Sequence, residues 1–139
     1  LHCAKYPYHK NTVGYDGHLP STHSEYLFAH RNGVLALNMV DAHGAKYFNV
    51  VQFQYAMLFI QKEVSKNKSV LINCNKGESR SPSVALVYLA HLGVVRNDSY
   101  ALAKEDFLKI YPKYNPSFGI SKYLIFTWKN LMQNINFNK

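Results

Sequence analysis

The sequence contains little cysteine and no long apolar run. Its 139 residues include two cysteines, Cys3 and Cys74, which are too few for a disulfide framework and lack zinc-site spacing. No stretch of about 18 apolar residues occurs, which excludes a membrane-spanning helix in this sequence. The polar residues His2, Lys5 and Lys10 interrupt the apolar start, so no signal peptide is expected, although the missing initial Met suggests a trimmed chain. These features predict a reduced, cytoplasmic protein.

Acidic residues are also scarce. Eight Asp and Glu face sixteen Lys and Arg, which gives a formal net charge of +8. Such a charge attracts nucleic acid, acidic membranes or phosphorylated substrates, and composition alone does not choose among them. A second interpretation is solubility, because most of these cations are lysines. No RNA-binding signature is visible, so we expect no nucleic-acid partner.

The chain has no internal repeat, low-complexity tract or linker rich in Pro, Gly and Ser. Together with 47% hydrophobic residues, this predicts one domain over residues 1–139. Residues 1–30 are polar, aromatic and rich in turn formers. We expect them to form an irregular segment packed on that domain, with one short helix near 24–30.

Apolar patterns then alternate between strand and helix. Val34–Met39, after an Asn32-Gly33 turn, and Ser69–Asn73 are short apolar runs typical of buried strands. Helical spacing occurs over 50–64, 81–92, 98–110 and 120–135. Ser81-Pro82 is suited to begin the second of these helices, which is apolar on nearly every side. This order predicts an α/β domain with a small central, mostly parallel sheet flanked by helices.

The segment from Cys74 to Ser81 joins the second predicted strand to the apolar helix. Such a connection gathers backbone N–H groups at a helix N-terminus, where they bind a phosphate dianion. Gly77 allows the close approach of the backbone, and Arg80 can hold two phosphoryl oxygens with its planar guanidinium group. The predicted phosphate-binding residues are Asn75, Lys76, Gly77, Glu78, Ser79 and Arg80.

Cys74 lies at the base of the same predicted loop. The environment that stabilises phosphate also stabilises a thiolate, so we expect the Cys74 pKa to fall below about 8.5. A thiolate beneath a phosphoryl group is a nucleophile for phosphorus, and Ser81 could donate a hydrogen bond to its sulfur. Cys-to-Arg spacing alone is weak evidence, but Gly77 and the flanking serines make it specific. The alternative is a buried cysteine with an unrelated surface arginine.

The leaving oxygen needs a proton donor on a facing loop. Asp41 follows the first predicted strand, at the sheet edge that should hold the Cys74 loop, and is our candidate for the general acid. Asp16 is the second candidate, and a turn-forming role for Asp41 stays open. Glu78 is interpreted as a rim charge that disfavours acidic substrates. Loop histidines such as His43 lack metal-site spacing, so no metal is expected.

Cys74–Ser81, the following Ser-Pro-Ser and Asn115–Gly119 resemble the dual-specificity branch of the cysteine-based protein tyrosine phosphatases. The resemblance runs from about Val34 to Trp128. It implies the corresponding fold, a phosphocysteine intermediate, a general acid on the Asp41 loop and no cofactor. One departure is Asn73, where the family usually has His, so the hydrogen bonds around the nucleophile should differ.

We therefore predict a monomeric, cysteine-dependent phosphatase whose partners are phosphorylated proteins. It would hydrolyse phosphotyrosine, with phosphoserine and phosphothreonine as a second substrate class, and its catalytic residues would be Cys74, Arg80, Asp41 and Ser81. Alternatives are a catalytically weak phosphate-binding module, a basic nucleic-acid or phosphoinositide binder, or a phosphatase of phosphoinositide or RNA phosphate. A disulfide between Cys3 and oxidised Cys74 stays an open question.

Overall fold

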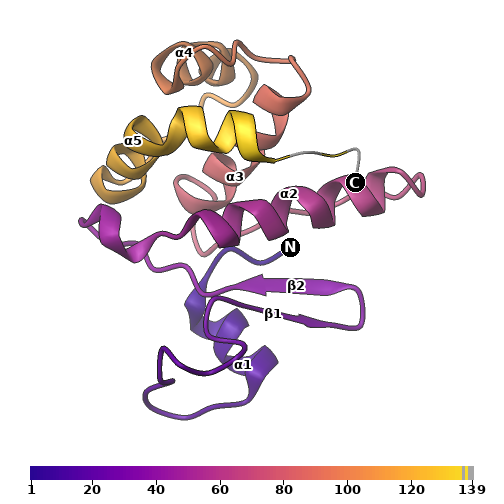
Figure 1. Cartoon of the computed structure of the whole chain (residues 1–139), viewed down its shortest axis with the longest axis vertical. Helices are drawn as coiled ribbons and strands as arrows, with labels where there is room; N and C mark the ends of the chain where they lie inside the picture. The colour runs from indigo at the N-terminus through magenta and orange to yellow at the C-terminus, as the bar shows by residue number, and fades with distance from the viewer. Residues whose placement is uncertain (136, 138–139) are drawn as a thin grey trace.

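The computed structural model describes residues 1–135 and residue 137, so the predicted domain end at residue 139 lies outside the described residues. The elements, in chain order, are η1 (Lys5–His9), α1 (Lys10–Val13), β1 (Phe28–Arg31), β2 (Val34–Leu37), η2 (Ala45–Tyr47), α2 (Val50–Val64), α3 (Arg80–His91), α4 (Tyr100–Ile110) and α5 (Phe118–Asn134). Figure 1 shows α2 crossing the middle of the molecule, with the β1–β2 hairpin on one side and α3, α4 and α5 on the other.

The sheet differs from the predicted one. Over the described residues it has two strands, β1 and β2, which pair antiparallel from Phe28↔Leu37 to Arg31↔Val34. Parallel pairing is limited to two isolated bridges, His2↔Ala36 and His2↔Asn73. Residue 2 thus lies between β2 and residues 69–73, which therefore do not pair with β2 and form no strand. The prediction of a central, mostly parallel sheet of the dual-specificity-phosphatase type was wrong.

The hairpin turn was predicted correctly, but the strand before it was not. Asn32 and Gly33 both have positive φ (50° and 76°), as the tight turn of a twisted hairpin requires. The short helix predicted near residues 24–30 is absent, because β1 occupies its second half. Pairing with β2 determines the conformation there, and local composition gave no sign of that partner.

The long helices form the core. On α2, the predicted apolar face is buried at Phe53, Met57 and Ile60, and the helix begins where Asn49 Oδ1 accepts a hydrogen bond from the Val51 N–H (2.9 Å). α3 packs against α2, α4 and α5, which explains why its sequence is apolar on nearly every side. No helix among the described residues is long and apolar enough to cross a membrane.

Gly119, in the first turn of α5, lies against the segment that carries Asp41. A Cβ atom at this position would collide with the backbone carbonyl of Ala42 and approach His43 C to 3.0 Å. Backbone cannot move aside as a flexible side chain does. Gly119→Ala is therefore expected to lower the free energy of unfolding by about 1–3 kcal/mol.

Thermal and chemical unfolding would measure this effect. Asn130→Ala, at an exposed position of the same helix, is the matched control and should change stability little. Equal stability of Gly119→Ala and the unmodified protein would show that the contact between α5 and the Asp41 segment is loose.

Candidate active site

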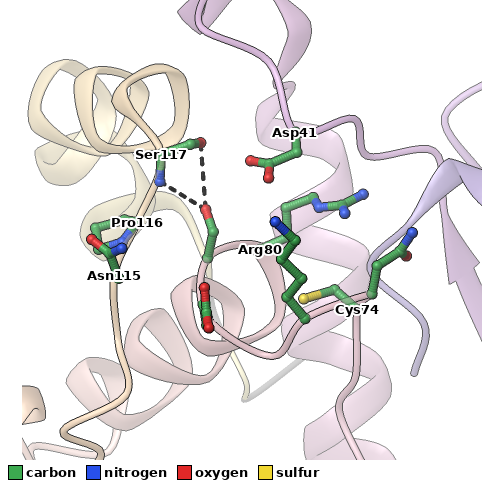
Figure 2. A pocket seen from close by; sticks show the side chains of 10 residues that line it. Asp41, Cys74, Arg80, Asn115, Pro116 and Ser117 are labelled. Carbon is green, nitrogen blue, oxygen red and sulfur yellow. Dashed lines mark hydrogen bonds between the residues drawn. The ribbon is translucent and has the colours of Figure 1, made fainter.

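A pocket of about 350 Å³ lies where three segments meet (Figure 2). The segment after β2 contributes Asp41, and the α4–α5 connection contributes residues 115–117. The loop before α3 contributes residues 74–76, 78 and 79, and Arg80 is the first residue of α3. The lining residues are Asp41, Cys74, Asn75, Lys76, Glu78, Ser79, Arg80, Asn115, Pro116 and Ser117. Seven of them were predicted from the sequence.

Cys74 lies at the base of this pocket and is 9% exposed. The Ser81 hydroxyl donates a hydrogen bond to Cys74 Sγ (3.2 Å). Burial by itself raises the pKa of the Cys74 thiol, but hydrogen bonds from the Ser81 hydroxyl and from the backbone N–H groups of Ser81, Gly77 and Lys76 outweigh it. The pKa of Cys74 is therefore lower than that of an ordinary cysteine, which favours the thiolate.

Ser81→Ala removes one of the hydrogen bonds that lower the Cys74 pKa. Because the thiolate fraction rises with pH, the acid limb of kcat/KM on 4-nitrophenyl phosphate is expected to move to higher pH by about one unit. Ser83→Ala is the matched control, because the Ser83 hydroxyl is equally buried but bonds Tyr114 Oη (2.8 Å). An unchanged acid limb in Ser81→Ala would contradict this role for the hydroxyl.

The N-cap residue of α3 does not cap the helix with its own side chain. The helix begins at Arg80, with Ser79 as the N-cap residue, rather than at Ser81-Pro82 as predicted. Neither serine hydroxyl caps the helix, because Ser79 Oγ accepts from the Ser117 N–H (2.9 Å) and Ser81 Oγ donates to Cys74 Sγ. N–H groups at a helix N-terminus that no serine hydroxyl caps are suited to an anion, and the Ser81 N–H already donates to Cys74 Sγ.

The loop itself is held from the side of α4 and α5. Gly77 has a φ of +69°, which lies in the left-handed region that favours glycine, and its carbonyl accepts a hydrogen bond from the Tyr111 hydroxyl (2.8 Å). The Asn115 N–H donates to the Glu78 carbonyl (2.8 Å). Gly77 itself does not line the pocket. Gly77 turns the backbone, and the hydrogen bond from Tyr111 fixes the loop to the end of α4. The sequence analysis did not identify Tyr111.

Arg80 is buried, with 8% of its surface exposed, and lines the pocket. Its Nη1 donates to the Met39 carbonyl (2.9 Å), which also accepts from the backbone N–H of Lys5 (2.8 Å). One hydrogen bond thus fixes the guanidinium group to the segment that carries Asp41. Its remaining donors are available to an anion in the pocket.

Asp41 lies across the pocket from the Cys74 loop, and Figure 2 shows its carboxylate directed toward the pocket. The alternative acid, Asp16, does not line this pocket and forms an ion pair with Lys10 instead (3.4 Å). The geometry therefore favours Asp41. Among the described residues, no group of three or more His, Cys, Asp and Glu side chains is arranged to hold a metal ion.

Asn73, directly before Cys74, contacts a histidine from a distant segment. The Asn73 Oδ1 atom lies 2.6 Å from His2 Nδ1, and because an amide oxygen only accepts, His2 Nδ1 carries the hydrogen. His2 in turn stacks on Tyr8. An imidazole from the start of the chain thus contacts the position before Cys74. The next residue, Cys3, is fully buried, and burial raises its pKa, so its thiol is protonated.

Comparison with curated proteins finds similarity to dual-specificity phosphatases over part of the chain. Dual specificity protein phosphatase Mpk3 of Drosophila melanogaster is 33% identical over 76 residues, which are 54% of this chain and 18% of that protein. Dual specificity protein phosphatase 9 of Homo sapiens is 39% identical over 64 residues, which are 45% of this chain and 17% of that protein. The chain thus spans less than a fifth of the length of either relative.

The family comparison gives a different assignment from the one predicted. The Rit1 DUSP-like domain family matches residues 35–125, which is more than half of the chain and includes the Cys74 loop and the Asp41 segment. Assignment to the dual-specificity branch itself was therefore wrong, because the signature loop on which it depended does not separate that branch from this family. The chain belongs to the family of Rit1 DUSP-like domains.

Proposed function

We propose that this domain hydrolyses phosphomonoesters through a phosphocysteine intermediate on Cys74. The observation that carries the proposal is the Cys74 thiol, which has a lowered pKa and lies in one pocket with Arg80 and Asp41. A nucleophile, an anion-binding group and a proton donor are the three parts that this reaction needs.

In the first step, the phosphate lies against the backbone N–H groups at the start of α3 and the guanidinium group of Arg80. Cys74 Sγ attacks phosphorus, and the bond between phosphorus and the leaving oxygen breaks. The Asp41 carboxyl group gives its proton to that oxygen, so the alcohol or phenol leaves neutral. Arg80 and the N–H groups stabilise the negative charge on the three equatorial oxygens.

In the second step, water attacks the phosphorus of phosphocysteine. Asp41, now a carboxylate, takes a proton from the water, and the S–P bond breaks. The sulfur leaves as a thiolate and receives the Ser81 hydrogen bond seen in the free protein. Phosphate is released, and Asp41 is protonated again for the next turnover.

Two substrate classes are consistent with this chemistry. The two curated relatives are by name protein phosphatases, which supports phosphotyrosine and phosphoserine or phosphothreonine in proteins. The second candidate is a phosphate on RNA, supported by the net charge of +8 and by membership in a family of tRNA-modifying enzyme domains.

Release of 4-nitrophenol from 4-nitrophenyl phosphate, in EDTA and across acidic to neutral pH, tests the reaction. Acid quenching during turnover should leave a phosphoryl group on the Cys74 peptide, which mass spectrometry would locate. Turnover without a phosphopeptide at Cys74 would contradict the covalent step. No turnover, with phosphate still raising the melting temperature, would mean that the pocket binds phosphate without hydrolysing its esters.

Asp41→Asn removes the proposed proton donor. Turnover of an alkyl phosphate such as phosphoserine peptide should fall by about 10²–10³, because an alkoxide leaves poorly without a proton. Hydrolysis of 4-nitrophenyl phosphate should fall less, because 4-nitrophenolate is a stable leaving group. Asp16→Asn, outside the pocket, is the control. An Asp41→Asn protein that retains full activity on the alkyl phosphate would move the acid role elsewhere.

A further inference from the structure

The outer face of α5 carries large apolar side chains and lysines instead of the usual polar surface. Phe118, Ile125 and Phe126 are 66%, 61% and 74% exposed, and Lys122 and Lys129 lie among them. We call these five residues the α5 stripe. The opposite face of the helix, with Ile120, Leu124 and Leu131, is fully buried in the core, so the stripe is not needed for packing.

The stripe is continuous and begins beside the pocket. At 100° and about 1.5 Å per residue, its five side chains fall within about 100° of arc along about 16 Å of helix. Its first residue, Phe118, directly follows Ser117, which lines the pocket. When the phosphate of a substrate is bound at Cys74, the rest of the substrate can therefore extend out of the pocket along α5.

The charge of the stripe points to an anionic partner. α5 contains no acidic residue, and neither of its stripe lysines has a carboxylate within 4 Å among the described residues. Lys122 Nζ lies 5.9 Å from the centre of the Phe118 ring, so cation and ring form one surface. The Phe118 ring, the Lys122 ammonium group and the Phe126 ring therefore alternate along the helix. Each residue lies about 6 Å from the next along the helix axis, which is about one turn.

From these features we infer that the α5 stripe binds a single-stranded polynucleotide whose terminal phosphate enters the Cys74 pocket. Exposed aromatic rings on which bases stack, interspersed with cations for the backbone, are the usual means of binding single strands. A protein partner fits less well, because lysine is depleted from protein interfaces. This inference rests on the proposed function and names its substrate class, which the sequence analysis gave only as an alternative.

Binding can be measured without turnover in the Cys74→Ser background. The probe is a short oligouridylate with a 5′-phosphate and a 3′-fluorophore, followed by fluorescence anisotropy at several salt concentrations. A matching oligodeoxythymidylate and a 3′-phosphorylated oligouridylate show whether the 2′-hydroxyl and the position of the phosphate contribute.

The decisive variant is Phe126→Ala/Lys129→Glu, and its control is Leu58→Ala/Lys62→Glu on α2. Both pairs replace one exposed apolar residue and reverse one exposed lysine, so the net charge changes equally. The α5 variant should weaken binding about tenfold, and the α2 variant less than about twofold. Circular dichroism and melting temperatures would establish that both variants are folded.

Three results would overturn the inference. The first is an equal loss of affinity in both variants, which would mean attraction by net charge alone. The second is equal binding of oligonucleotides with and without a terminal phosphate, which would separate the stripe from the pocket. The third is an acidic phosphopeptide of the same charge that competes as well as the oligonucleotide, which would indicate a protein partner.

Failure of the proposed function would look different. The chain with Cys74 intact would then leave 4-nitrophenyl phosphate unhydrolysed, while the dependence of oligonucleotide binding on α5 could still be measured. Conversely, normal turnover of this small substrate together with no binding of any oligonucleotide would overturn the inference and leave the hydrolytic mechanism standing.

Discussion

Replacing Cys74 by serine is expected to reduce the hydrolysis of 4-nitrophenyl phosphate by about four orders of magnitude or more. Hydrogen bonds from Ser81 and the loop backbone lower the pKa of the Cys74 thiol, which favours the thiolate. A serine hydroxyl in the same place stays protonated, because its ordinary pKa lies far higher. The anion-binding part of the pocket is unchanged by this substitution.

Two controls separate loss of the nucleophile from loss of the fold. Phosphate or tungstate should still raise the melting temperature of Cys74→Ser, because the α3 N-terminus and Arg80 remain. Cys3→Ala removes the other thiol, which does not line the pocket, and should retain most of the turnover. If Cys74→Ser kept a tenth or more of the activity, the nucleophile would have to be another group.

The second large effect is expected at Arg80. Arg80→Lys should reduce kcat/KM by about 10²–10³, although the charge is retained, because an ammonium group cannot hold two phosphoryl oxygens in one plane. The substitution also alters the hydrogen bond from Arg80 Nη1 to the Met39 carbonyl (2.9 Å), so the Asp41 segment loses one of its two fixed contacts at that carbonyl.

Steady-state kinetics and thermal unfolding together test this assignment. Arg31→Lys, an exposed arginine of the hairpin, is the matched control and should leave kcat and KM unchanged. A lysine at position 80 that supports activity within threefold of the unmodified enzyme would show that charge alone suffices. Loss of activity with a large fall in melting temperature would show instead that Arg80 acts mainly through the fold.

The parts of the fold that depend on local patterns could be predicted. The 3.6-residue period placed α2 at its observed bounds, Val50–Val64, because apolar residues at helical spacing mark the face of a helix that is buried. The loop from Cys74 to Ser81 was found for a similar reason. Its chemistry depends on residues that are consecutive in sequence, and the segment that follows it is a buried helix.

Features that join distant segments could not be predicted. The parallel sheet was predicted from two apolar runs, but His2 lies between them, and nothing in residues 1–3 identifies them as a pairing partner. The sequence analysis also did not identify Asn115–Ser117 as a wall of the pocket. Its position depends on hydrogen bonds between Ser79 and Ser117 and between Asn115 and Glu78, which are 37 or 38 residues apart.

The position of the first residues also affects how the domain can fold. His2 contacts Asn73 across 71 residues of chain, and Cys3 donates its N–H to the Asn73 carbonyl (2.7 Å). During synthesis, these contacts beside Cys74 therefore cannot form until residue 73 has been made. The β1–β2 hairpin depends on nearer contacts and can form earlier. Such distant pairing raises the contact order and slows folding, so the Cys74 loop should be among the last parts to reach its native form.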